Sequence, residues 1–377
     1  MKKMIDFNVP FVTGIELGNI EMLNLQKKYS GDGLFTNKCS SYLQEKFGVH
    51  HALLTTSCTH ALEMCALLID IKPGDEVIMP SFTFVSTANA FVLRGAKIVF
   101  VDIEPHTLNM DDTKIENAIS ERTRALVVVH YAGASCNMNN VRKIADKYNL
   151  VLIEDAAQAI HSKYNNKYLG TYGDLSAISF HETKNIHCGE GGALLINNPK
   201  YVNRAEIIRE KGTDRSLFLK GLVDKYTWRN IGSSYLLSEL NAAFLLPQLE
   251  QSENVITRRA LLWDRYYLNL SGCKNIRLLS YSKEVKHNAH IFIIILDSNA
   301  IRDSLMEYLK TKGIIAVFHY LPLHKSPAGI EFGTFIGEDL YTSDISGRLL
   351  RLPLHLDLEE NEVDFVCKTI LDYLDSY

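Results

Sequence analysis

The chain has 377 residues, of which 46% are hydrophobic and 22% are charged, and its formal net charge is −4. This length allows two domains with an ample buried core, and the composition is ordinary for a soluble globular protein. The negative charge provides no basic field for nucleic acid, and no apolar run reaches the length of a membrane span. We therefore expect the chain to bind neither nucleic acid nor a membrane. The N-terminal segment shows no secretory signal, and the seven cysteines form no C-x-x-C pair that would indicate disulfides or zinc. We therefore expect a cytoplasmic protein without a metal site.

Short apolar runs alternate with amphipathic stretches up to Asn198. The expected strands cover residues 51–56, 76–79, 97–101, 125–129, 151–153, 177–180 and 193–196, and the expected helices cover 60–71, 87–93, 111–119 and 137–148. Such alternation predicts βαβ units, and hence an α/β fold with a mostly parallel sheet that carries helices on both faces. The first forty residues are mixed in character, with turn signals at 29–33.

The pattern changes after Asn198. We expect a helix at 201–212, then a long irregular and functional loop at 213–233. Residues 236–270 are strongly helical and form either two helices or one bent helix. The remaining elements are strands at 290–296 and 314–318 and helices at 300–311 and 359–375. We predict a large domain at 1–250 and a smaller C-terminal α/β domain at 251–377.

Polar residues follow three of the predicted strands. Ser57–Thr59 ends the first, Asp155–Gln158 ends another, and Lys184 lies beyond a third, before the glycine-rich turn Gly189–Gly192. Ligands of open parallel sheets bind outside the carboxyl ends of the strands, so these residues are candidates for one site. Plainer roles stay open for each: helix caps for Ser57, Thr59 and Asp155, and surface positions for Gln158 and Lys184.

A lysine, a carboxylate and a small hydroxyl turn together indicate pyridoxal 5′-phosphate. The lysine condenses with the cofactor aldehyde, the carboxylate keeps the pyridine nitrogen protonated, and a helix N-terminus with hydroxyls holds the phosphate. An aromatic side chain must cover one ring face; Phe82 and Phe84 are candidates, although both also fit a plain core. Glu154 is expected to be structural. A dinucleotide site is not supported, because no complete G-x-G-x-x-G is present, and His319 and His324 lack the companions of a metal site.

Six segments together resemble the DegT/StrS family of sugar-nucleotide aminotransferases, which are fold type I pyridoxal-phosphate enzymes. The segments are Ser57–Thr59, Pro80–Phe84, Glu154–Gln158, Ser179–Lys184, Gly189–Gly192 and His319–His324, and the resemblance spans essentially the whole chain. It implies a homodimer with active sites shared between subunits. It also implies cofactor contacts from Lys184 (covalent), Asp155 (ring nitrogen), Gln158 (ring oxygen), Phe84 (ring face), and Ser57, Cys58, Thr59 and Ser179 (phosphate).

The resemblance implies a further phosphate contact from the partner subunit. Many members supply an asparagine there, in a G-x-N-x-R segment. This chain has Gly232-Ser-Ser-Tyr-Leu236 instead. We expect Ser234, Arg229 or Asn230 to substitute for the missing asparagine.

The inserted segment 210–235 resembles the branch that makes dTDP-4-amino-4,6-dideoxy-D-galactose for enterobacterial common antigen. That branch implies L-glutamate as donor, dTDP-4-dehydro-6-deoxy-D-glucose as acceptor and 2-oxoglutarate as second product. The weaker candidates for substrate binding are Arg229 for the glutamate carboxylate, Lys220 and Tyr320 for the diphosphate, and His319 beside them.

Three alternatives stay open. The first is an aminotransferase for another 4-keto or 3-keto sugar nucleotide. The second is a dehydratase of the same family, which would carry histidine in place of Lys184. The third is a cofactor-binding regulatory protein without catalysis, which predicts an incomplete site.

Overall fold

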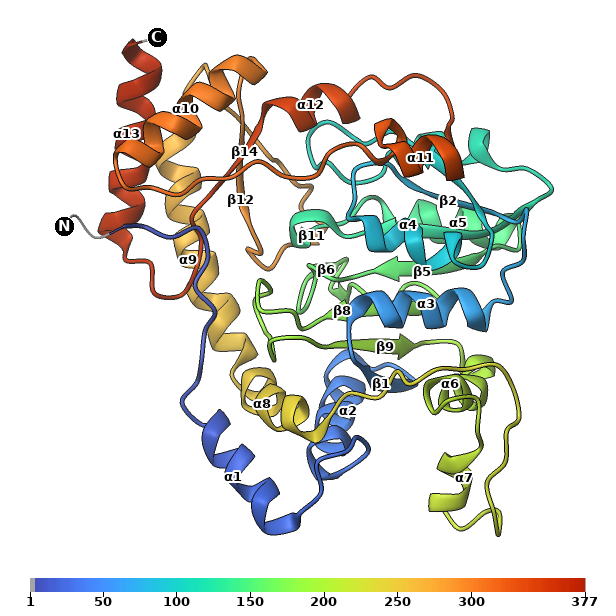
Figure 1. Cartoon of the computed structure of the whole chain (residues 1–377). Coiled ribbons are helices and arrows are strands. Elements are labelled where there is room, and N and C mark those ends of the chain that lie inside the picture. Colours follow the sequence, from blue (N-terminus) through green and yellow to red (C-terminus); the bar gives the residue numbers. More distant parts are fainter. Residues whose placement is uncertain (1–3, 377) are drawn as a thin grey trace.

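A computed structural model of the chain describes residues 4–376, and its centre is a large mixed sheet (Figure 1). In sheet order the strands are β1 (His51–Thr55), β9 (Gly192–Ile196), β8 (Leu175–Ser179), β5 (Val151–Asp155), β4 (Thr123–Val129), β2 (Glu76–Pro80), β3 (Lys97–Val101) and β13 (Gly333–Phe335). Neighbours from β8 through to β13 pair in parallel, whereas β9 runs antiparallel to both β1 and β8. The α/β class and the mostly parallel sheet are thus confirmed.

Both faces of this sheet are buried, because successive side chains along each strand enter different cores. Leu54, for example, packs in one apolar cluster and Leu53 in the other. The first cluster is covered by α2 (Leu34–Phe47), α5 (Met138–Lys147) and α8 (Glu239–Glu250), and the second by α3 (Cys58–Leu68), α4 (Val85–Val92) and α6 (Val202–Arg209). Strands that are apolar on both faces need helices on both sides, as the sequence pattern predicts.

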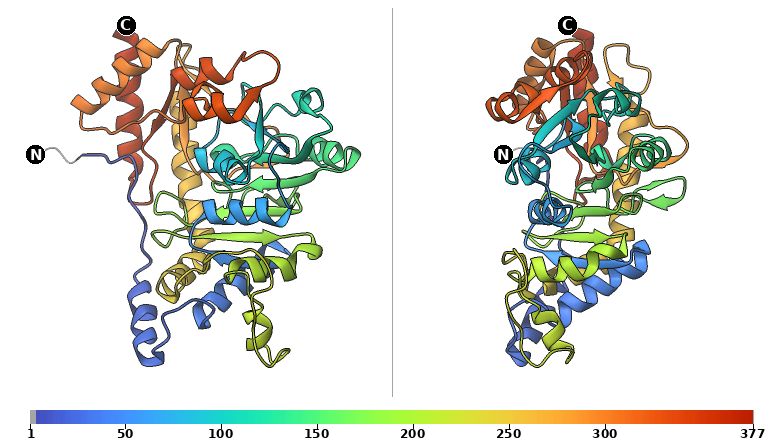
Figure 2. Two further views of the ribbon diagram at one scale, coloured as in Figure 1. Left: turned by 45° about the vertical axis from the view of Figure 1, so that its right-hand side comes forward. Right: turned by 90° about the vertical axis from the view of Figure 1, so that its right-hand side faces the viewer.

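The C-terminal third builds a second core around a small sheet. Its strands are β10 (Arg277–Leu278), β12 (Phe292–Ile295) and β14 (Leu349–Leu352), and its helices are α9 (Ser252–Leu270), α10 (Asn299–Thr311) and α13 (Glu360–Ser376). Figures 1 and 2 show the long α9 running from α8 toward α10 and α13. Residues 236–270 therefore form two helices. A domain boundary near residue 250 stays a prediction, and the C-terminal β13 pairs with β3 of the large sheet.

The remaining elements are short. They are α1 (Glu16–Gln26), α7 (Arg215–Leu219), α11 (Pro327–Phe332), α12 (Thr342–Arg348), the strands β6 (Lys163–Tyr164), β7 (Lys167–Tyr168) and β11 (Val285–Lys286), and 3-10 turns at Asp112–Lys114, Glu116–Ala118, Tyr131–Gly133, Pro199–Tyr201 and Leu323–Lys325. Within residues 4–376, no helix combines the length and apolar character that crossing a bilayer requires.

Three sequence expectations are corrected. The helix at 111–119 is a pair of 3-10 turns, the first capped by the Asp111 side chain. The strand expected at 314–318 does not form. This segment pairs with other parts of the chain only through two single bridges, Ile314 with Ile5 and Val317 with Arg351. The irregular loop at 213–233 contains α7.

Helix α2, the second helix of the chain, was not predicted from the sequence, and the reason is physical. Its first turn is capped by Glu239, whose carboxylate accepts N–H bonds from Gly33, Phe35 and Thr36 at 2.8–3.0 Å. The cap therefore comes from a residue far along the chain, and no local capping residue announces the helix.

Candidate active site

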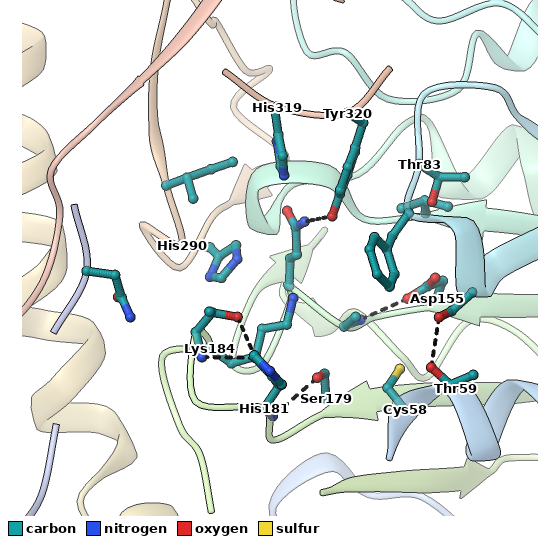
Figure 3. Close-up of a pocket in the computed structure, with 18 of the residues that line it drawn as sticks. Cys58, Thr59, Thr83, Asp155, Ser179, His181, Lys184, His290, His319 and Tyr320 are labelled. Carbon is teal, nitrogen blue, oxygen red and sulfur yellow. Dashed lines mark hydrogen bonds between the residues drawn. The ribbon is translucent and has the colours of Figure 1, made fainter. Parts of the chain in front are cut away.

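A cavity of about 550 Å³ lies where β5 and β8 end and α3 begins. Most of the predicted site residues line it: Ser57, Cys58, Thr59, Phe84, Asp155, Gln158, Ser179, Lys184, His319 and Tyr320. Figure 3 shows His319 and Tyr320 on the side of the cavity opposite Cys58 and Ser179. The volume is in the range of small-molecule sites. Segments from both halves of the chain thus form one pocket.

Lys184 sits on the connection between β8 and β9, as expected, and these two strands run antiparallel. Backbone bonds beyond the two strands close this loop, for example from Phe180 N–H to Gly191 O at 2.8 Å. Ile186 anchors it in the core, where it is fully buried, and the Asn241 amide of α8 donates to Cys188 O at 2.9 Å. The lysine side chain is left to line the cavity from a fixed backbone.

The environment of Lys184 favours a neutral amine. Burial lowers the pKa of this amine and the charge of Arg351 adds to the effect, while Cys58 and Asp155 oppose it. Within residues 4–376 the amine makes no hydrogen bond or ion pair, so its lone pair is not engaged once the proton leaves. A lysine of lowered pKa in such a site can act as a nucleophile or as a base.

Asp155 ends β5 with its carboxylate buried in the cavity wall. Thr87 Oγ1 donates to Oδ2 at 2.7 Å and the Ala157 N–H donates to Oδ1 at 3.2 Å. Burial raises the pKa of this carboxyl, against these two hydrogen bonds and the charge of Lys184. The local turn made with Ala157 does not begin an α-helix, so the plainer role of helix cap does not apply. The carboxylate retains acceptor capacity for a cationic partner.

The N-terminus of α3 faces the same cavity. Ser57 is the N-cap, its Oγ accepting from the His60 N–H at 3.1 Å, so the plain capping role of this hydroxyl is confirmed. The N–H groups of Cys58 and Thr59 in the first turn have no intrahelical acceptor and are free to bind an anion. Ser179, at the end of β8, adds a hydroxyl to the cavity lining.

Gly192 makes the approach of this turn possible. β9 places Gly192 between Thr55 of β1 and Ser179 of β8. A Cβ at Gly192 would meet the backbone of Ser57 and Cys58 at 2.4 Å. The strand ends that carry the candidate residues are not all direct neighbours, because the antiparallel β9 separates β1 from β8.

The two candidate ring-stacking residues have different surroundings. Phe82 is 1% exposed and packs edge-on against Tyr131, so it belongs to the core. Phe84 is 54% exposed and lines the cavity. Tyr320, which also lines the cavity, is tilted against Phe84 with 6.0 Å between the ring centroids.

Gln158 is buried and not on the surface. Its Oε1 accepts the Ala132 N–H at 2.8 Å, and its Nε2 donates to the Tyr320 hydroxyl at 3.0 Å. Beside it, Tyr131 OH lies 2.5 Å from His319 Nδ1. Burial lowers the pKa of His319 well below its usual value, so this imidazole is neutral.

Glu154, next to Asp155, is structural. Its carboxylate accepts backbone N–H bonds from Gly170, Tyr172 and Gly173 at 2.6–2.7 Å, and it lies 2.7 Å from His130 Nε2. The network holds the chain segment between β5 and β8.

The candidates from the segment after α6 all lie outside this cavity; they are Lys220, Arg229, Asn230 and Ser234. Ser234 is exposed, Lys220 lies 3.9 Å from Glu206, and Arg229 is paired with Asp214 at 2.6 Å. Figure 1 shows α7, which carries the start of this segment, at the periphery of the molecule. These residues do not contribute to the pocket of their own chain, because the segment that follows α6 turns outward.

Among the polar cavity residues that the sequence did not reveal are three basic ones from the C-terminal third. Arg259 comes from α9, His290 precedes β12, and Arg351 lies in β14. None follows a strand of the large sheet, and none has a local motif that marks it. Only the packing of α9 and the small sheet against the strand ends brings them to the pocket.

The residues present fit the chemistry of pyridoxal 5′-phosphate. An amine of lowered pKa, a buried carboxylate with spare acceptor capacity, free helix N–H groups and an exposed aromatic face share one cavity. No cluster of three or more His, Cys, Asp or Glu in the described chain is arranged to hold a metal ion.

Comparisons with known proteins agree with this picture. The profile of the DegT/DnrJ/EryC1/StrS aminotransferase family matches residues 17–371. An uncharacterized protein of Methanocaldococcus jannaschii is 33% identical over 339 residues, which cover 87% of each chain. The aminotransferase TlmJ of Streptoalloteichus hindustanus superposes with a TM-score of 0.91 at 26% identity over 99% of both chains. Helicobacter pylori PseC, an aminotransferase of pseudoaminic acid biosynthesis, gives 0.90 at 26% identity over 100% of both chains.

Proposed function

The chain belongs to the DegT/DnrJ/EryC1/StrS aminotransferase family, and from this premise we propose that it moves the amino group of L-glutamate to carbon 4 of dTDP-4-dehydro-6-deoxy-D-glucose. Pyridoxal 5′-phosphate is the cofactor typical of this family. The proposed products are dTDP-4-amino-4,6-dideoxy-D-galactose and 2-oxoglutarate.

One observation carries the proposal: Lys184 and Asp155 line the same cavity together with the first turn of α3. When bound, the cofactor supplies an aldehyde that condenses with amines and a ring that withdraws electrons from the attached carbon. In our proposal Asp155 keeps the ring nitrogen of the cofactor protonated. The cofactor phosphate is held by the N–H groups of Cys58 and Thr59 together with Ser57 and Ser179.

Further contacts complete the proposed binding of the ring. Phe84 covers one face, and Gln158 reaches the ring oxygen.

The amine of Lys184 has two tasks in this scheme. It holds the cofactor between turnovers, and after its release it takes the proton from the α-carbon of glutamate. In the second half of the cycle it returns a proton to carbon 4 of the sugar. The lowered pKa supports both tasks, because only the neutral amine can attack a carbonyl or accept a proton.

The proposed sugar nucleotide rests on the resemblance of segment 210–235 to the enterobacterial-common-antigen branch. Tyr320 and His319, which line the cavity, are proposed to contact this substrate. The expected cytoplasmic location stays a prediction.

We also propose a homodimer in which each subunit completes the other's pocket. Ser234, Arg229 and Lys220 are exposed and lie outside the cavity of their own chain, so they are available to a second subunit. Ser234 would then take the place of the family's phosphate-binding asparagine.

The test is to incubate the purified protein with the cofactor, L-glutamate and the 4-keto sugar nucleotide and to determine the product by NMR. We expect an axial amine at carbon 4. An equatorial amine or an amine at carbon 3 would indicate another sugar aminotransferase, and loss of a hydroxyl without an amine would indicate a dehydratase. Lys184→Met should give no product, whereas Lys200→Met, at an exposed position outside the pocket, should match the native protein.

A further inference from the structure

We propose that Arg259 and Arg351 form the carboxylate subsite of the pocket and that its ligand is a dicarboxylic amino donor of the size of glutamate. This inference rests on the proposed aminotransferase function and adds to it the residues that select the donor. The two arginines replace Arg229 as the proposed contact of the glutamate carboxylate, because Arg229 is paired with Asp214 on the outer segment.

Arg259 is a buried cation without an acidic partner. It is 6% exposed and lines the cavity. Its Nε donates to Ala289 O at 3.0 Å and its Nη2 donates to His290 O at 2.6 Å. In the described chain it pairs with no carboxylate, and Nη1 has no hydrogen-bond partner. Two backbone carbonyls thus fix the guanidinium while leaving its charge uncompensated.

Arg351 is half-buried and holds a similarly oriented guanidinium from the small sheet. Its Nε and Nη2 donate to Phe318 O at 3.2 and 3.0 Å, and its guanidinium lies 4.8 Å from the centroid of the Phe7 ring. It too lines the cavity and has no carboxylate partner among residues 4–376. Both arginines therefore have oriented planar groups with donors left over.

Uncompensated buried cations are unfavourable unless an anion joins them. Burial lowers the pKa of Arg259 to about 10, so the side chain stays charged at neutral pH. The neighbouring Arg258 behaves in the ordinary way and pairs with Glu359 and Glu360 at 3.5–3.9 Å. The contrast within one helix indicates that the counter-ion of Arg259 is a ligand.

The position of the two arginines favours a donor carboxylate over a nucleotide diphosphate. Arg351 acts electrostatically on Lys184, and Lys184 and both arginines act on His290, so the four groups line the cavity within electrostatic reach of one another. The α-carbon of an amino donor must reach Lys184, and its carboxylate is attached to that carbon. A carboxylate can also reach a guanidinium as recessed as that of Arg259 and bind it through two N–H groups. The two guanidinium cations would then pair with the two carboxylates of a dicarboxylic donor.

The test uses glutarate, which has both carboxylates of glutamate but no amine, titrated into the cofactor-loaded protein by calorimetry. Arg259→Met and Arg351→Met should each weaken glutarate binding by about 10- to 100-fold, the effect of losing a charged hydrogen bond. The same variants should raise KM for glutamate by a similar factor and leave KM for the sugar nucleotide unchanged. Arg258→Met is the matched control and should bind glutarate like the native protein.

The outcomes separate this inference from the proposed function. If the enzyme transaminates but both variants keep native glutarate affinity, the subsite is wrong and the function stands. If the variants instead lose affinity for dTDP alone, the anion is the nucleotide diphosphate and the inference is overturned. If glutarate binds through both arginines but no sugar is aminated, the subsite stands and the proposed function fails. Should Arg259→Met not fold, Arg259→Lys, which keeps the charge but not the forked donors, should still weaken glutarate binding.

Discussion

Replacement of Gly192 by alanine tests whether the α3 turn is held in place by β9. A methyl group at this position would lie 2.4 Å from Cys58 N and from Ser57 C, where ordinary contact begins at 3.4 Å. Since β9 is hydrogen-bonded to β1 and β8 on both sides, the turn must retreat by about 1 Å. We expect a loss of about 1–3 kcal/mol in the free energy of unfolding. Cofactor affinity should fall by about 100-fold, because the phosphate donors move with the turn.

The assay combines urea unfolding of the cofactor-free protein with a titration of pyridoxal 5′-phosphate followed by absorbance. Gly18→Ala is the control, because a methyl group at Gly18 of α1 meets nothing within 4 Å. It should stabilise the protein by about 0.5–1 kcal/mol and leave cofactor binding unchanged. Native cofactor affinity in Gly192→Ala would refute the reasoning.

Three further changes test other parts of the structure. Asp155→Asn should slow the glutamate half-reaction by about 100-fold, since two pKa units at the ring nitrogen amount to about 2.7 kcal/mol; a native rate in stopped-flow absorbance would contradict this. Glu154→Gln should cost about 3 kcal/mol in urea unfolding, because its amide donor would face the buried backbone N–H groups of residues 170–173. Burial lowers the pKa of His161 from 6.5 to about 4. Between these pH values the unfolded chain binds a proton at His161 that the native chain does not bind, so the free energy of unfolding should fall as the pH drops from about 6.5 to about 4. His161→Gln should flatten that dependence between pH 7 and 4.5, and an identical slope would contradict the assignment.

The strands and most helices of the large sheet could be predicted because local patterns determine them. Leu53 and Leu54 alternate between two cores, and the sequence around them already reads as a strand buried on both faces. The antiparallel direction of β9 was not foreseen, because a short apolar run carries no sign of its direction. The start of α2 depends on Glu239, a contact between distant parts of the chain that no local pattern encodes.

The site divides in the same way. Asp155 and Lys184 could be predicted to share a cavity because each follows an apolar run that indicates a strand, and a carboxylate and an amine near strand ends are a specific chemical pair. Arg259 and Arg351 could not, because each lies inside a regular element and looks like an ordinary surface cation until α9 and β14 pack against the strand ends.

The central claim is that Lys184 is the amine that bonds to the cofactor. The direct measurement is to reduce the cofactor-loaded protein with sodium borohydride, digest it and locate the modification by mass spectrometry. We predict that the cofactor remains on the peptide that contains Lys184, and that Lys184→Met carries no modification. Attachment to any other lysine, or no attachment in the native protein, would contradict the account.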